Sequence, residues 1–155
     1  MNGGSAGPDT LDVSRVPNVQ VISTDHGSLH GFRGTASNIT GGFDNIDVIQ
    51  GGSGSSLIID DRADTSPATW TITSTTVTRQ VQGQAPTTWT YGSIGNLEVD
   101  IGSGGSLVYV LSTSTATSIH DGGTDVRFRL NGLTHPWLAT VPRTKRRGEN
   151  MVLRK

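Results

Sequence analysis

The stretch "GSGGSLVYVLST", from Gly102 to Thr113, places a run of glycine and serine directly before a run of large apolar residues. Glycine adopts positive φ at little cost and therefore suits a tight turn. The apolar run is β-branched and aromatic, and it has the length of one buried strand. The stretch therefore predicts a turn that leads directly into a β-strand.

The same order of residue types recurs at four other places in the chain. Each copy has a glycine pair or Gly-x-Gly, then small or polar residues, and then a strand that contains Val, Leu or Ile. These copies span residues 2–14, 41–50, 51–61 and 120–132. Recurrence of one turn–strand unit is typical of repeat proteins.

The composition favours a single all-β domain. The chain has 155 residues, of which 21 are glycine, and only 32% are hydrophobic. No segment before residue 133 has helical periodicity, whereas many neighbouring short apolar segments start roughly nine to twelve residues apart. The expected strands are Thr10–Val13, Val19–Ser23, Asn45–Ile49, Leu57–Ile59, Thr69–Thr73, Thr88–Tyr91, Leu97–Ile101, Leu107–Leu111 and Val126–Leu130.

Two architectures fit this spacing, a parallel β-solenoid (β-helix) and an antiparallel β-sandwich. In a solenoid each coil bends in the same way, so one Gly-rich turn recurs and small residues let the coils stack. We therefore predict a parallel β-solenoid of short strands with Gly-rich turns over residues 1–132, and keep the antiparallel sandwich as the alternative.

Residues 133–155 differ from the rest of the chain. They contain Pro136 and Pro142, and residues 143–155 carry a net charge of +5 against −6 for residues 1–142. We expect a flexible basic tail. Residues 143–155 contain no aromatic residue to stack on bases, so we expect no nucleic-acid partner.

The Gly-rich turns followed by short strands resemble the β-solenoid repeats of large bacterial surface and secreted proteins. "GPDTLDV" (Gly7–Val13) and the segment Leu57–Thr113 carry the resemblance, which is to degenerate hemolysin-type (RTX-like) calcium-binding repeats. It implies a non-enzymatic structural or adhesive segment of a bacterial extracellular or cell-surface protein. The first ten residues lack the features of a signal peptide, so we expect any export signal to lie outside this chain.

The calcium ligands of that motif are only partly present. The residue that aligns with the motif aspartate in each of the five copies is, in chain order, Asp9, Ile46, Ser56, Ser106 and Asp125. The second copy also offers Asp44 and Asp47. Because neutral hydroxyls are poor calcium ligands, we expect no cofactor and no calcium requirement. A calcium-dependent RTX-like folding module is the alternative.

Other polar groups give no catalytic constellation, so we predict no enzyme and no catalytic, cofactor-binding or metal-binding residues. "DDRAD" (residues 60–64) is interpreted as a solvated turn. His26 and His30 lie four residues apart, but the neighbouring glycines indicate a loop rather than a helical metal site.

Because side chains alternate along a strand, Trp70 lies on one face of its strand, and Trp89 and Tyr91 share one face of another strand. The opposite face of each strand carries threonines. We expect these aromatic residues in the core. If they were exposed they would stack on sugars, so a carbohydrate-binding or carbohydrate-active β-helix is a further alternative.

The expected partners are a second copy of the chain, through terminal coils, and surface glycans. No apolar run has the length of a membrane span. At the N-terminal end, only Gly3, Gly4 and Pro8 oppose strand pairing with another copy.

Overall fold

The structure is a computed structural model that describes residues 1–4, 7–122, 127–130, 138–139 and 151–154. Side chains are described as far as residue 122. The prediction at Asp125 therefore lies outside the described residues.

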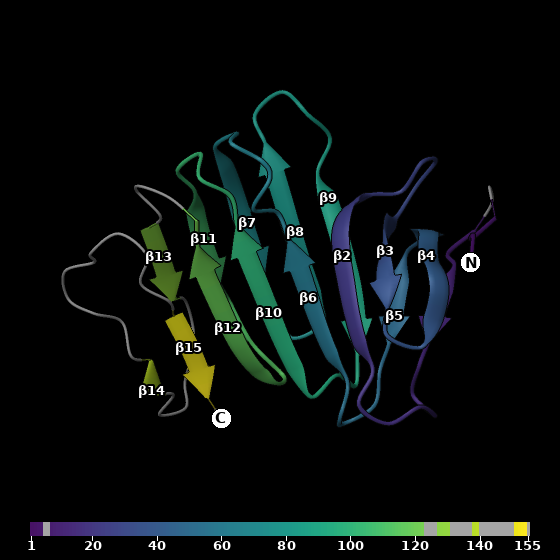
Figure 1. Ribbon diagram of the computed structural model, residues 1–155. Coiled ribbons are helices and arrows are strands. Elements are labelled where there is room, and N and C mark those ends of the chain that lie inside the picture. Colours follow the sequence, from purple (N-terminus) through teal and green to yellow (C-terminus); the bar gives the residue numbers. More distant parts are fainter. Residues whose placement is uncertain (5–6, 123–126, 131–137, 140–150, 155) are drawn as a thin grey trace.

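Within these residues every regular element is a β-strand, and the strands form two mixed sheets that face each other (Figure 1). The seven-stranded sheet has the order β1 (Thr10–Asp12), β5 (Val48–Gln50), β9 (Thr87–Gly92), β8 (Thr76–Val81), β7 (Ala68–Ile72), β11 (Leu107–Val110) and β13 (Arg127–Leu130). The eight-stranded sheet has the order β14 (Leu138–Ala139), β15 (Met151–Arg154), β12 (Ala116–Asp121), β10 (Asn96–Ile101), β6 (Ser56–Asp60), β2 (Gln20–His26), β3 (Phe32–Ala36) and β4 (Ile39–Ile46). The prediction of an all-β chain is confirmed.

Four neighbouring strands of the eight-stranded sheet, β2, β6, β10 and β12, run parallel and pair without a register shift. One inward row consists of Val21, Leu57, Leu97 and Thr117, and the next consists of Ser23, Ile59, Val99 and Ile119. All eight side chains are buried. Because side chains alternate between the faces of a strand, one register fixes which residues of all four strands enter the core.

The chain crosses from one sheet to the other between successive parallel strands. Asp100 contacts His120, and Thr115 contacts Gly95; the residues of each pair are 20 positions apart. In this part of the chain, one coil through both sheets therefore contains 20 residues. Two insertions interrupt the parallel order. The β3–β4 hairpin extends the eight-stranded sheet beyond β2, and β8 pairs antiparallel between β7 and β9.

The Gly-rich turns allow close packing between neighbouring chain segments, as the sequence pattern predicts. A Cβ atom at Gly102 would lie 1.9 Å from the carbonyl oxygen of Asp64, and one at Gly95 would lie 1.9 Å from that of Ser53. Real Cβ atoms do not approach backbone oxygen that closely. Only glycine fits where these turns pass one another.

The predicted strand segments match β1, β2, β6, β7, β9, β10, β11 and β13. The segment Asn45–Ile49 was wrong as a single strand, because the chain changes sheets at Asp47, between β4 and β5. Four internal strands were missed. In β3 and β4 glycines resembled turn residues, while β8 and β12 contain few apolar residues.

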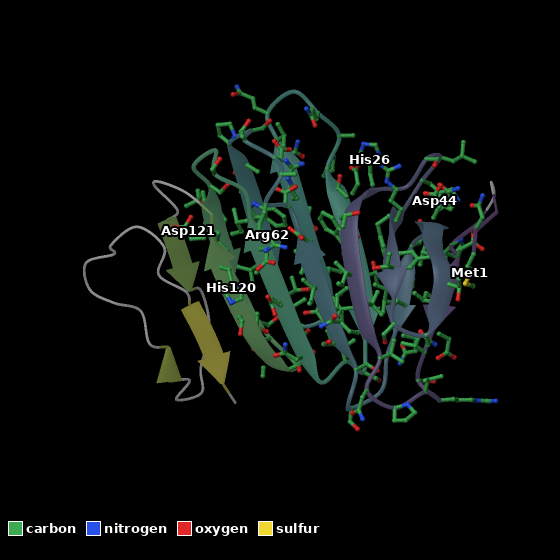
Figure 2. The ribbon with its side chains drawn as sticks, viewed as in Figure 1. Met1, His26, Asp44, Arg62, His120 and Asp121 are labelled. Atoms are coloured by element: carbon green, nitrogen blue, oxygen red, sulfur yellow. The ribbon has the colours of Figure 1, made fainter. Side chains whose placement is uncertain are left out.

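Both ends of the parallel array carry additional pairing. At the N-terminal end the β3–β4 hairpin covers β2, and Met1 and Gly3 exchange backbone hydrogen bonds with Asp44 (Figures 1 and 2). This end is therefore better protected against strand pairing with another copy than the sequence, with only Gly3, Gly4 and Pro8, indicated. At the other end β14 and β15, which lie within residues 133–155, join the sheet beside β12.

Candidate functional sites

The three aromatic residues singled out in the sequence lie between the sheets. Trp70, Trp89 and Tyr91 are 0%, 4% and 2% exposed. The two tryptophan rings are stacked, with centroids 6.0 Å apart and an interplanar angle of 13°. The expectation that they pack in the core is confirmed, and none of them is available to stack on a sugar.

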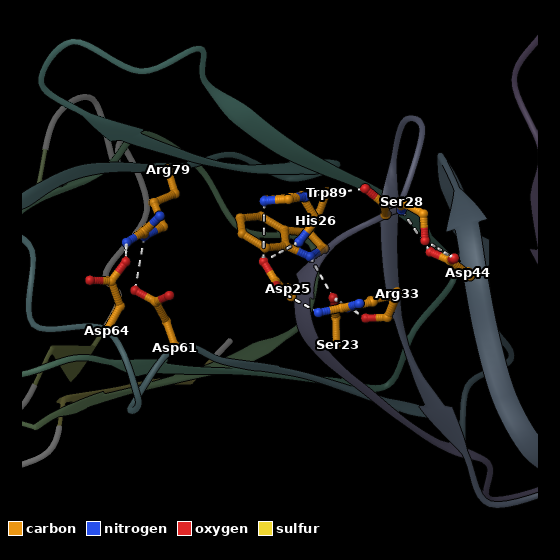
Figure 3. A network of polar contacts seen from close by, with 11 residues as sticks. Ser23, Asp25, His26, Ser28, Arg33, Asp44, Asp61, Asp64, Arg79 and Trp89 are labelled. Atoms are coloured by element: carbon orange, nitrogen blue, oxygen red, sulfur yellow. Dashed lines mark hydrogen bonds and ion pairs between the residues drawn. The ribbon is translucent and has the colours of Figure 1, made fainter.

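A polar cluster lies beside the stacked tryptophans, in the turn after β6 (Figure 3). Arg79, from β8, donates to Asp61 at 2.9 Å and also binds Asp64. Its guanidinium carbon lies 5.9 Å from the centroid of the Trp70 ring. The interpretation of this turn as solvated was therefore wrong for Asp61, whose side chain is 18% exposed and fastens the turn to β8.

Burial raises the pKa of Asp61 to about 6, although the positive charge of Arg79 acts in the opposite direction. The neighbouring Asp60 behaves differently. Its carboxylate accepts two hydrogen bonds from the exposed Arg62, and these hold its pKa below the usual value. The pKa values of these two consecutive aspartates thus shift in opposite directions, because their side chains point to opposite sides of the sheet.

A buried hydrogen bond joins the two sheets near the tryptophans. Trp89 Nε1 donates to Ser23 Oγ at 2.7 Å, and Ser23 Oγ in turn lies 3.2 Å from the carbonyl oxygen of Arg33 (Figure 3). Ser23 occupies a core row and is fully buried. The contact satisfies one polar group from each sheet and indicates a fixed relative position of β2 and β9.

The two histidines four residues apart do not act together, because His26 ends β2 and His30 lies in the loop between β2 and β3. His26 is mostly exposed, with Nε2 3.6 Å from Asp25 Oδ1. His30 instead belongs to a cluster with Asp9 and Asp47, here called the N-terminal cluster, in which one ligand atom from each residue lies within 4.8 Å of the others. His30 Nδ1 lies 3.1 Å from Asp47 Oδ1.

His30 is held from both sides of its ring. Nε2 donates to the carbonyl oxygen of Gly4 at 2.6 Å and lies 3.8 Å from Asp9 Oδ2. The hydrogen bond to Gly4 and then the one to Asp47 raise the pKa of His30 above its ordinary value. Asp47 also accepts a hydrogen bond from the backbone N–H of Asp9 at 2.8 Å.

A second group of potential ligands, Glu98, Asp100 and His120, is here called the β10–β12 cluster. It lies on the outer face of the parallel strands, where Asp100 pairs in register with Asp60 and His120 (Figure 2). His120 Nδ1 lies 2.7 Å from Asp100 Oδ1 and 3.2 Å from Glu98 Oε1. Arg62 Nε approaches Asp100 Oδ2 at 3.5 Å, so this cluster already includes a cation.

Six threonines share the outer face of the seven-stranded sheet. Three adjacent strands, β7, β8 and β9, each contribute Thr-x-Thr, and the residues are Thr69, Thr71, Thr76, Thr78, Thr88 and Thr90. Thr78 and Thr88 hydrogen-bond to each other at 3.1 Å. The sequence pattern placed threonines opposite the aromatic residues, but only strand pairing gathers them into one surface, here called the threonine face.

The positions of the calcium motif do not form one site. Ser106 is 7% exposed, and Ser56 begins β6 within the parallel rows. Asp9 lies near Asp47, but the third member of that group is a histidine. The calcium-binding motif singles out Asp9 as a possible ligand but does not include His30. The two residues are 21 positions apart, and no sequence pattern relates them.

Comparison with known proteins gives no match: no family model, no curated protein and no solved structure is significantly similar to this chain. Among the described residues, no helix has the length and apolar character of a transmembrane segment.

Proposed function

We propose that residues 1–132 form a β-solenoid and serve as a non-enzymatic structural or adhesive segment of a bacterial extracellular or cell-surface protein. The observation that carries this proposal is the in-register stacking of β2, β6, β10 and β12, with the chain crossing to the other sheet between them. In such an array each coil contacts only its neighbours, so length and stiffness grow with coil number. The localisation rests on the resemblance of the Gly-rich turns to surface-protein repeats.

Insertion of one coil tests the architecture. A second copy of residues 96–115, which span β10 and β11, is placed after Thr115. A solenoid accepts the copy, keeps cooperative unfolding and lengthens by about 4.8 Å per added coil, the distance between neighbouring strands. Small-angle X-ray scattering measures the length.

A matched control inserts one residue fewer, residues 97–115. This shifts the chain by one position and turns the core side chains of the following strands outward. Retained folding of the 20-residue insertion, with loss of stability in the 19-residue one, supports the solenoid. Equal disruption by both insertions overturns it.

The adhesive part of the proposal assigns surface glycans to the threonine face, because hydroxyl groups on a sheet match the hydrogen-bonding groups of sugars. A glycan array probed with the intact protein and with a Thr71→Val, Thr88→Val variant tests this. Binding that the variant loses supports adhesion through this face. Absence of binding, or equal binding by both, rejects that assignment and leaves the structural role.

The two alternatives have less support. A calcium-dependent folding module requires carboxylates on neighbouring coils, whereas Ser56 and Ser106 stand at those positions. A carbohydrate-active β-helix would use carboxylates of the outer face, but Asp60 and Asp100 are already engaged by Arg62 and His120. Folding that requires millimolar calcium, or depolymerisation of a polysaccharide, would favour the respective alternative.

Self-association through terminal coils is also part of the proposal. Since β3 and β4 cover β2, the edge strands at the N-terminal end are the three-residue β1 and β4, whose outer edge already pairs with residues 1–3 at Gly42 and Asp44. Sedimentation at rising concentration, with and without residues 1–14, measures this association. A monomer that is unchanged by the deletion excludes association at that end.

A further inference from the structure

We propose that Asp9, His30 and Asp47 form a binding site for a divalent transition-metal ion of the Zn²⁺ type, which fastens the N-terminal segment to the junction between β4 and β5. The three residues come from separate parts of the chain: the segment before β1, the loop between β2 and β3, and the residue between β4 and β5. The site is independent of the structural and adhesive role proposed above.

The geometry suits a small ion. One potential ligand atom from each of the three residues lies within 4.8 Å of the others. Tetrahedral zinc holds nitrogen and oxygen ligands at about 2.0–2.2 Å, which places neighbouring ligands about 3.4 Å apart. His30 Nδ1 and Asp47 Oδ1 are 3.1 Å apart, so little movement would admit an ion between them.

The second ring nitrogen of His30 is already oriented as in known zinc sites. A metal-bound histidine usually donates its other ring N–H to a carboxylate or a backbone carbonyl, which fixes the tautomer. Here Nε2 faces the carbonyl oxygen of Gly4 at 2.6 Å. That contact requires a proton on Nε2, so a metal ion would bind at Nδ1, in place of the proton that this nitrogen donates to Asp47.

Asp9 supplies an independent observation that points to a ligand. Its Oδ2 atom is buried and accepts no hydrogen bond, although the side chain as a whole is 33% exposed. A buried carboxylate oxygen without a donor is costly to maintain. His30 Nε2, 3.8 Å away, is beyond hydrogen-bonding distance and is engaged by Gly4, and a bound cation would satisfy the Asp9 oxygen.

The ligand types select the class of metal. Calcium and magnesium prefer oxygen ligands, whereas imidazole with carboxylates suits zinc and similar ions. The chain contains no cysteine, so no thiolate competes for such an ion. A groove lined by His26, Leu29, His30 and Pro86 adjoins the cluster and gives access from solvent.

The β10–β12 cluster offers a comparison within the same molecule. It also contains one histidine and two carboxylates, but the guanidinium of Arg62 lies 3.5 Å from Asp100. A divalent cation there would be repelled by this fixed positive charge. We therefore expect the N-terminal cluster, and not the β10–β12 cluster, to bind the metal.

Isothermal titration with ZnCl₂ on the full chain tests the proposal, with thermal unfolding and Co²⁺ absorption as further readouts. The variants are His30→Gln and the isosteric Asp9→Asn, and His120→Gln is the matched control. The wild-type protein and H120Q are expected to bind one equivalent with Kd below about 10 μM. At 100 times Kd the melting temperature should rise by roughly 5–10 °C.

In H30Q and D9N the affinity should fall at least tenfold, and the visible Co²⁺ bands of a low-coordinate site should disappear. D9N keeps the shape of the side chain and serves as the test if H30Q does not fold. Failure of the wild type to bind Zn²⁺, or loss of binding in H120Q with retention in H30Q and D9N, overturns the proposal. Equal stabilisation by Ca²⁺ overturns the assigned class of metal.

Discussion

Replacement of Asp61 by asparagine should change how the stability of this protein depends on pH. Asp61 lies in the turn after β6, its side chain is 18% exposed, and it accepts a hydrogen bond from Arg79 at 2.9 Å. Burial raises its pKa from 3.8 to about 6. A carboxyl group whose pKa is raised by folding holds its proton more tightly in the native state than in the unfolded state.

The sign and size of the effect follow from that shift. The contribution of Asp61 to the free energy of unfolding is fully present below pH 3.8 and is lost as the pH rises through about 6. A shift of about two pKa units corresponds to about 3 kcal/mol in total, of which about 2 kcal/mol lies between pH 4 and pH 7. The asparagine side chain does not titrate, so D61N should gain about 2 kcal/mol relative to the wild type across this range.

Urea unfolding followed by tryptophan fluorescence at pH 4, 5, 6 and 7 measures the difference. Asp60→Asn is the control, because hydrogen bonds from Arg62 lower the pKa of Asp60 and its contribution therefore has the opposite sign. A difference in unfolding free energy between wild type and D61N that stays constant within about 0.5 kcal/mol over this range would refute the reasoning. It would mean that burial does not raise the pKa of Asp61.

Five further substitutions, in three tests, probe the packing. Leu97→Ala, in a core row, should lower the free energy of unfolding by about 2–5 kcal/mol, whereas Ile58→Ala on the outer face of the same sheet should cost about 1 kcal/mol or less; urea titration compares them. Ser23→Ala leaves Trp89 Nε1 without its acceptor and should cost about 1–3 kcal/mol, with a shift in tryptophan emission as the local readout. Gly41→Ala, with φ of +83° and open space around the new Cβ, should cost about 1–2 kcal/mol by thermal unfolding. Gly42→Ala should cost more, since its Cβ would lie 2.6 Å from the carbonyl oxygen of Gly34, and equal effects of the two would contradict this crowding between β3 and β4.

The sequence predicted the elements whose pattern is local. Leu107–Leu111 and Leu97–Ile101 are apolar and β-branched over a strand length, and a glycine turn precedes the first of them, so each forms a strand almost irrespective of its partners. The inward orientation of Trp70 and Trp89 also followed from alternation alone, because successive side chains point to opposite faces.

The strands that were missed depend on their neighbours. β12, "ATSIHD", has few large apolar residues and becomes a strand because β10 pairs with it along its whole length. In β4 the consecutive glycines Gly41 and Gly42 do have the positive φ of turn residues, yet pairing with β3 and hydrogen bonds to the first residues keep the segment in the sheet. Strand formation there is decided by backbone pairing between distant segments, which no local pattern records.

The candidate sites show the same division. The sequence by itself determined the all-β class, the recurrence of Gly-rich turns and the apolar face of each strong strand, since each is set by neighbours in the chain. Only the tertiary structure decided that His30 meets Asp9 and Asp47, that Arg79 neutralises the turn after β6, and that three threonine pairs form one surface. These groups are brought together by strand order and register, and both are determined by the packing of the whole core rather than by any one segment.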